Sequence, residues 1–114
     1  MIVVITARGA GLGAWVDDDF AASRRIVIVH ENGRFDAIAN PHPEDATGIH
    51  LAEFLVKTIK PLDVLVTGAI GGKALDVLLS HGVKVYAAST GSVMELADAA
   101  TRDALPLAIP QTEI

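Results

Sequence analysis

An Asn-Gly pair between two short apolar stretches constrains the fold of this chain more than any other feature. Residues 25–30 and 35–40 have the apolar character of strands, and only residues 31–34, with Asn32-Gly33 at their centre, separate them. Asn-Gly is the strongest short-range signal for a β-hairpin because both residues tolerate positive φ angles. We therefore expect the two stretches to be antiparallel neighbours in one sheet.

The rest of the chain alternates between apolar strands and amphipathic helices. We predict further strands at residues 2–6, 63–66 and 83–87, helices at about 46–60 and 71–80, and a last helix from the Ser92–Glu95 capping box to before Pro106. With right-handed crossovers, this order predicts a mixed five-stranded sheet of order 3-2-1-4-5, with strand 2 antiparallel to the others. Helices on both faces complete a three-layer α/β/α fold with ribonuclease H-like topology. We expect one domain over residues 1–114, whose tail packs as an extended segment or not at all.

Composition excludes several classes of partner and cofactor. With 14 acidic and 9 basic residues and no basic run, the chain lacks the clustered cations that nucleic acid requires. It has no cysteine, which excludes disulfides and thiolate ligands. No apolar stretch is long enough to span a bilayer, and residues 1–9 indicate a strand rather than a signal peptide. We therefore expect a cytoplasmic protein with no nucleic-acid or membrane partner.

Three loops rich in Gly, Ser and Thr follow strands 1, 4 and 5, whose carboxyl ends share one edge of the predicted sheet. They are residues 6–13 (TARGAGLG), 67–73 (TGAIGGK) and 88–92 (ASTGS). Ligands of open α/β sheets bind at this edge, where the strand order reverses, and backbone N–H groups, helix N-termini and cations there favour a bulky anion. We therefore predict a binding crevice formed by Arg8, Gly9, Gly11, Thr67, Gly68, Gly71, Lys73, Ser89 and Thr90. The alternative is that these loops are ordinary turns, with both cations in solvent.

Two of these loops are close to nucleotide-binding motifs. A P-loop needs a glycine at position 67 and Ser or Thr at position 74, but the chain has Thr67 and Ala74. Residues 9–14 fit the dinucleotide pattern G-x-G-x-x-[GA], with Glu31 at a suitable distance. The hairpin argues against a dinucleotide fold, in which strand 2 leads into a helix and a parallel strand. A helix over residues 12–24 would instead favour the dinucleotide-binding fold.

Acidic and histidine side chains are the remaining candidates for metal binding. Asp17, Asp18 and Asp19 are consecutive, so we interpret them as a solvated surface turn rather than a magnesium site. His42 and His50 flank the start of the first helix, at the edge of the glycine loops, and are the candidate metal or cluster ligands. The alternative is that both are ordinary solvent-exposed histidines. No nucleophile–base pair or pair of acids can be placed together, so we expect no enzymatic activity.

Several segments together resemble one known family. Residues 66–74 are similar to its [VI]TG-x-IG-x-x-A motif, and residues 82–86 are similar to its GIKVY strand. The Ser92–Glu95 cap, Asn40-Pro41 and Thr47-Gly48-Ile49 fall where the family has a cap, an NP pair and an AGI helix start. Over nearly all of its length, the chain resembles the dinitrogenase iron–molybdenum cofactor biosynthesis domain family, to which nitrogenase accessory factors belong.

The resemblance implies a non-catalytic accessory or carrier protein. It implies binding of an anionic iron–sulfur or iron–sulfur–molybdenum cofactor, or a precursor, in the crevice at the C-terminal ends of strands 1, 4 and 5. It also implies other cofactor-assembly proteins as partners. Two positions depart from the family pattern, because Asp19 and Asp45 stand where the family usually has histidines. The second hypothesis is therefore a binding module for a small phosphorylated or carboxylated ligand, or a nucleotide, that has lost the usual histidine.

Overall fold

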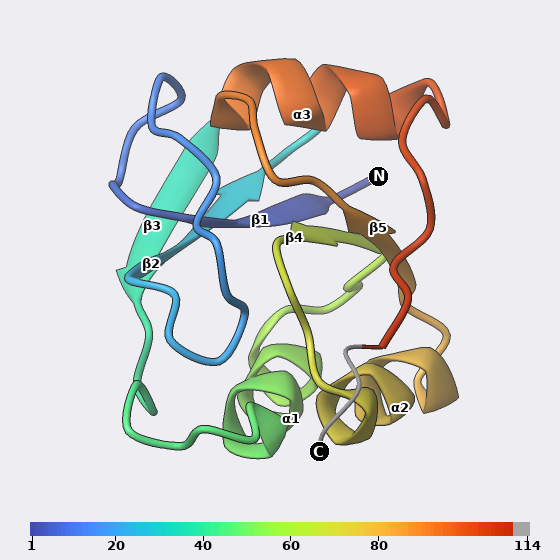
Figure 1. Cartoon of the computed structure of the whole chain (residues 1–114). Coiled ribbons are helices and arrows are strands. Elements are labelled where there is room, and N and C mark those ends of the chain that lie inside the picture. The colour runs from blue at the N-terminus through green and yellow to red at the C-terminus, as the bar shows by residue number, and fades with distance from the viewer. Residues whose placement is uncertain (111–114) are drawn as a thin grey trace.

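Five strands form one mixed sheet in the order that the hairpin and the crossovers predict. The computed structural model describes residues 1–110, and its sheet has the order β3-β2-β1-β4-β5 (Figure 1). β2 pairs antiparallel with both β1 and β3, whereas β1–β4 and β4–β5 are parallel pairs. The predicted topology is therefore confirmed. The strands are Val3–Ala7 (β1), Arg25–Val29 (β2), Phe35–Ala39 (β3), Val64–Thr67 (β4) and Lys84–Ala87 (β5).

The hairpin between β2 and β3 turns at the Asn-Gly pair. Gly33 has a φ of 84°, which glycine adopts without steric cost. The His30 N–H donates to the Arg34 carbonyl at 2.8 Å, and the register then pairs Val29 with Phe35. The turn therefore sets the register of the two strands, as the sequence indicates.

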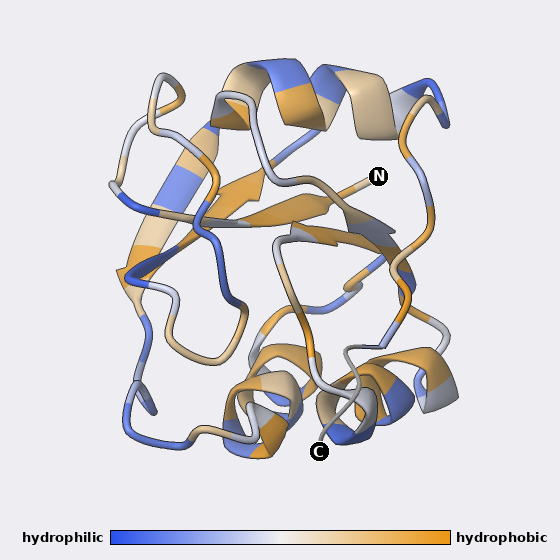
Figure 2. Ribbon diagram, in the orientation of Figure 1, coloured by the Kyte–Doolittle hydropathy of each residue, from blue (hydrophilic) through white to orange (hydrophobic). Residues whose placement is uncertain are grey.

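Helices cover both faces of the sheet and complete the three layers (Figure 1). Successive residues along each central strand point to opposite faces of the sheet and pack against different helices. Val4 and Leu65 belong to the core cluster with the first two helices, and Ile5 and Val66 belong to the cluster with the third. Hydrophobic residues are accordingly concentrated on the central strands (Figure 2). None of the helices within residues 1–110 is long and apolar enough to cross a membrane. The helices are α1 (Ile49–Thr58) and α2 (Gly72–Ser80) on one face and α3 (Val93–Thr101) on the other.

The start of α1 differs most from its predicted position. The helix begins at Ile49 rather than at about residue 46, because Gly48 has a left-handed φ of 74°. A Cβ at this position would lie 3.0 Å from the Phe20 ring. Glycine is therefore required here both for the backbone angle and for the contact with the loop that precedes β2.

The tail packs as an extended segment against the outer edge of β5. The Ala87 N–H donates to the Pro106 carbonyl at 2.9 Å, and the Ala108 N–H donates to the Val85 carbonyl at 3.0 Å. Of the two outcomes that we expected, extended packing or none, the structure shows extended packing, with hydrogen bonds to β5 as far as Ala108. The rest of the predicted tail, residues 111–114, lies outside the described residues.

Residues 8–24 connect β1 to β2 without a helix. The Arg8 N–H donates to the Trp15 carbonyl at 2.9 Å and closes the glycine turn, and the Asp17 N–H then donates to the Thr6 carbonyl at 3.0 Å. Since β2 runs antiparallel to β1 and no helix covers residues 12–24, the dinucleotide-binding alternative is wrong.

Candidate functional site

The chain segment at residues 17–20 crosses directly over the first residues after β4. The Phe20 N–H donates to the Ala69 carbonyl and the Ala69 N–H donates to the Asp18 carbonyl, both at 2.8 Å. A Cβ on Gly68 would lie only 2.3 Å from the Asp18 carbonyl oxygen. Gly68 is therefore the residue that lets the two backbones approach this closely.

The acidic run differs from the solvated turn that we expected. Asp17 is only 9% exposed, and its carboxylate accepts the Asp18 N–H at 2.9 Å and the Arg24 N–H at 3.0 Å. The interpretation is therefore wrong for Asp17, which closes the loop before β2, whereas Asp18 and Asp19 are exposed. Within residues 1–110, no three His, Cys, Asp or Glu side chains come together as a metal-binding group.

A crevice of about 490 Å³ opens at the C-terminal ends of β4 and β5. Its volume is in the range of small-molecule sites, which measure about 300–1,000 Å³. The side chains are mostly small and aliphatic, so backbone groups lie close to anything that enters. Its walls combine the loops after β4 and β5, the tail and the crossing segment. The lining residues are Gly68, Ala69, Ile70, Ala87, Ala88, Ser89, Pro106, Ala108, Ile109 and Asp18.

Several of the predicted binding residues lie in this crevice or beside it. Gly68 and Ser89 line it. The Arg8 guanidinium lies 3.0 Å from the carboxylate of Asp18, a lining residue, and both side chains are largely exposed. Exposed pairs of this kind contribute only about 0–1 kcal/mol, so Arg8 can leave Asp18 for an anionic ligand.

The N-terminus of α2 follows the crevice loop directly. Gly71 is the N-cap residue, and Lys73 is exposed in the first turn. No side chain in the described residues caps this helix. The first N–H groups of an uncapped helix, together with its dipole, attract anions.

The other two helix starts are occupied by the protein itself. At α3, Ser92 and Glu95 form the predicted capping box, and the Val93 and Met94 N–H groups donate to carbonyls in the glycine turn, both at 2.9 Å. At α1, the Asp45 carboxylate accepts a first-turn N–H. Among the three helices, α2 is therefore the one whose first-turn N–H groups have no partner within the described residues.

The remaining predicted binding residues lie away from the crevice lining. Gly9 and Gly11 belong to the turn that approaches the start of α3, and Thr90 is exposed in the loop before that helix. Thr67 is fully buried, and its hydroxyl lies 2.7 Å from the Thr6 hydroxyl. This pair joins β4 to β1, so the Thr67 hydroxyl already has a partner within the sheet.

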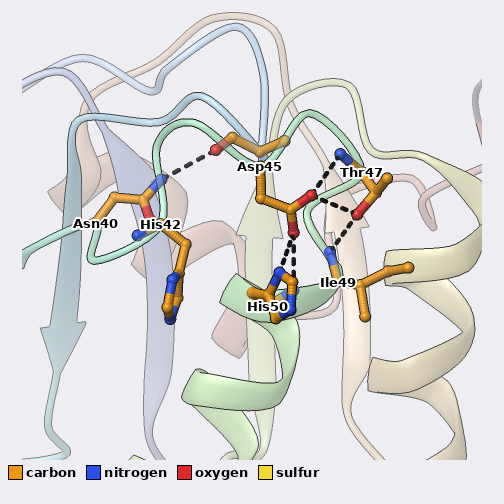
Figure 3. A network of polar contacts seen from close by, with 7 residues as sticks. Asn40, His42, Asp45, Thr47, Ile49 and His50 are labelled. Carbon is orange, nitrogen blue, oxygen red and sulfur yellow. Dashed lines mark hydrogen bonds and ion pairs between the residues drawn. The ribbon is translucent and has the colours of Figure 1, made fainter.

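The two candidate metal ligands lie side by side at the start of α1 (Figure 3). The ring centroids of His42 and His50 are 5.5 Å apart. The Asp45 carboxylate lies just before α1 and accepts the backbone N–H of His50 at 3.1 Å. It also lies 3.0 Å from ring Nδ1 of His50. Thr47 donates to the same carboxylate through its hydroxyl at 2.7 Å.

These contacts keep Asp45 ionised. The Thr47 hydroxyl and then the backbone N–H of His50 lower the pKa of Asp45 from 3.8 to about 2. An ionised carboxylate only accepts hydrogen bonds, so Nδ1 of His50 carries the proton in this contact. The Nε2 lone pair of a neutral His50 is then free to bind an electrophile.

Sequence reasoning named two of the ten lining residues, Gly68 and Ser89, and missed the other eight. Ala69, Ile70, Ala87 and Ala88 lie in or directly beside the predicted loops, whereas the other four come from elsewhere in the chain. Asp18 was interpreted only as part of an acidic turn, although it directly precedes Asp19, one of the two positions where the family usually has a histidine. Pro106, Ala108 and Ile109 give no functional signal beyond an apolar tail between prolines, because their position depends on strand pairing with β5.

The fold defines a small α/β protein with a crevice outside the carboxyl ends of parallel strands, which is where open α/β sheets bind ligands. Residues 1–102 match the family model described as dinitrogenase iron-molybdenum cofactor, so the chain belongs to this family and the resemblance is confirmed. No curated protein matches the chain significantly.

Two solved structures share the whole fold. The apo form of the orange protein from Desulfovibrio gigas has a TM-score of 0.85 and 26% identity, over 98% of this chain and 96% of that chain. A putative NifB protein from Thermotoga has a TM-score of 0.80 and 29% identity, over 98% of this chain and 97% of that chain. Family and neighbours together indicate a small cofactor-binding accessory protein.

Proposed function

We propose that this protein, acting as one nitrogenase accessory factor-like domain, is a non-catalytic carrier of an anionic iron–sulfur or iron–sulfur–molybdenum cofactor or precursor. The observation that carries the proposal is the crevice beside the start of α2, which no side chain of residues 1–110 caps. Family membership supports the cofactor class. The orange protein is described in an apo form, which supports a binding role for that relative.

The residues around the crevice suit a polyanion better than a cation. The first-turn N–H groups of α2 and the ammonium of Lys73 supply positive charge on one side. Arg8 supplies positive charge at the rim of the crevice, where its guanidinium leaves Asp18 and binds the ligand instead. With no cysteine in the chain, such a ligand is held by amides and cations rather than by thiolates.

The alternative is a binding module for a small phosphorylated or carboxylated molecule, or a nucleotide. The aliphatic lining of the crevice and the aspartates at positions 19 and 45, where the family usually has histidines, favour it. Both hypotheses use the same crevice, and they differ in the elements that the ligand contains. We place either function in the cytoplasm, with cofactor-assembly proteins as partners of the carrier.

Native mass spectrometry of four proteins tests the proposal. Wild type, Ala69→Leu, Arg8→Ala/Lys73→Ala and Ala10→Leu are purified without oxygen from cells supplied with iron and molybdenum. Ala69 is an exposed lining residue, so leucine there fills the crevice; Ala10 is equally exposed but lies outside the lining and is the matched control.

We expect an added mass containing iron, sulfur or molybdenum in wild type and Ala10→Leu. This mass is lost in Ala69→Leu and reduced in the double variant. An organic phosphate or nucleotide retained instead supports the alternative. Loss of the added mass in the Ala10→Leu control as well would contradict the crevice as the binding place.

A further inference from the structure

The rings of two histidines at the start of α1 lie close together, with centroids 5.5 Å apart. We propose that His42 and His50 form a site for a divalent transition-metal ion such as Zn²⁺, distinct from the crevice and positioned by Asp45. Neither histidine lines the crevice. The site therefore does not depend on the function proposed above.

The distance between the rings fits two imidazoles on one ion. A zinc–nitrogen bond of about 2.0–2.1 Å places the metal about 3.2 Å from each ring centroid, and a tetrahedral angle then separates the centroids by about 5.2 Å. The centroids of His42 and His50 are 5.5 Å apart, and the ring planes are inclined by 42°. His50 is 66% exposed, so an ion from solvent can reach its ring.

His50 has the outer contact that metal-binding histidines usually have. Its Nδ1 lies 3.0 Å from the Asp45 carboxylate, which orients the ring and leaves Nε2 for the metal. Carboxylates in this position also raise the basicity of the bound imidazole. Asp45 is itself fixed by Thr47, so the orientation of His50 is built into the turn before α1 (Figure 3).

His42 is held by a separate set of contacts. Its backbone N–H donates to the Asn40 side chain at 2.9 Å, and the Asn40 amide in turn donates to the carbonyls of Ala21 and Ser23, both at 3.0 Å. Its ring packs edge-on against Phe54, with a centroid distance of 6.5 Å. The backbone of His42 and the ring of His50 are therefore held by the fold before any ion arrives, which lowers the cost of binding.

The chemistry of the pair selects the kind of ion. Neutral imidazoles suit Zn²⁺, Ni²⁺ and Cu²⁺, whereas Mg²⁺ and Ca²⁺ prefer oxygen ligands. Because no third metal-binding side chain joins the pair within residues 1–110, the other positions on the ion are open to water or an external ligand.

Zinc titration of ¹⁵N-labelled protein tests this site, with the histidine ring nitrogens observed by NMR. We expect zinc to shift the ring signals of His42 and His50 together and to saturate at one equivalent, while His30 and His81 stay unchanged. His42→Gln and His50→Gln should each weaken binding at least about tenfold. His81→Gln is the matched control, since His81 is exposed at the end of α2, and it should bind as wild type does.

Asp45→Asn tests the positioning role. The change should weaken zinc binding about 10- to 100-fold and shift the neutral His50 ring away from the form protonated at Nδ1, which the ring ¹⁵N shifts report without metal. Far-UV circular dichroism checks that α1 is retained. The proposal is overturned if millimolar zinc shifts no ring signal, shifts all four histidines alike, or binds both single variants as tightly as wild type.

Discussion

Replacing Gly68 with alanine tests whether the close backbone crossing holds the candidate site together. The added Cβ would lie 2.3 Å from the Asp18 carbonyl oxygen and 2.5 Å from that of Asp17. These are backbone atoms, so the crossing segment has to move as a whole. Its movement breaks the two 2.8 Å hydrogen bonds through Ala69.

The expected loss of stability follows from these contacts. Two hydrogen bonds at about 0.5–1.5 kcal/mol each, together with overpacking of about 1–3 kcal/mol, give a loss of about 4 kcal/mol. For a domain of this size that corresponds to a fall in the unfolding temperature of about 16 °C. Thermal and urea unfolding followed by circular dichroism measure both quantities.

Gly13→Ala is the matched control for this experiment. Nothing lies within 4 Å of a Cβ at position 13, and the backbone there is outside the left-handed region. Alanine should therefore leave the stability unchanged or raise it by about 0.5 kcal/mol, because it restricts the unfolded chain. Equal unfolding midpoints for the Gly68 and Gly13 variants would refute the reasoning, since the crossing would then tolerate a side chain.

Three further predictions concern the caps and the tail. Ser92→Ala removes the capping box of α3 and should cost about 1 kcal/mol in urea unfolding; an unchanged midpoint would contradict the role of the cap. The pKa of Asp103 is lowered by the Tyr86 hydroxyl and then by Lys84. The ionised Asp103 therefore stabilises the folded state fully above its unfolded pKa of 3.8, and this stabilisation is lost as the pH falls through the lower folded pKa. Asp103→Asn, which keeps a residue type that tolerates the φ of 55°, should therefore flatten the acid limb of a stability–pH curve; an unaltered limb would argue against these contacts. Ala108→Pro removes the N–H that bonds the Val85 carbonyl and should speed amide exchange at Ala87, and unchanged protection there would show that the tail pairing is independent of this bond.

The strand order could be predicted because local signals determine it. The Asn-Gly turn makes β2 and β3 antiparallel neighbours, and the glycine-rich turns lead parallel strands into helices. These signals lie within a few residues of the structure that they form. The start of α1 at Gly48 was harder to predict, because the contact that excludes a side chain there comes from Phe20, far away in the sequence.

The candidate site was predictable as an edge of the sheet but not residue by residue. Thr67 has the hydroxyl expected of a binding residue, yet strand register places it opposite Thr6 and uses that hydroxyl. Whether a glycine faces a ligand or another backbone likewise depends on chain crossings, as at Gly68. Pairing of the tail with β5 supplies the last wall, and no local sequence signal predicts it.

The order of the crevice walls along the chain determines when the crevice is completed during protein synthesis. Its walls come from residue 18, from residues 68–70 and 87–89, and from residues as late as 109. Chains emerge from the ribosome N-terminus first, so the sheet can begin to pair while the last wall is still unmade. A growing chain therefore has no complete crevice until residue 109 has been released. On the proposed function, only chains that contain residue 109 can retain the ligand, and truncation before that residue should abolish retention.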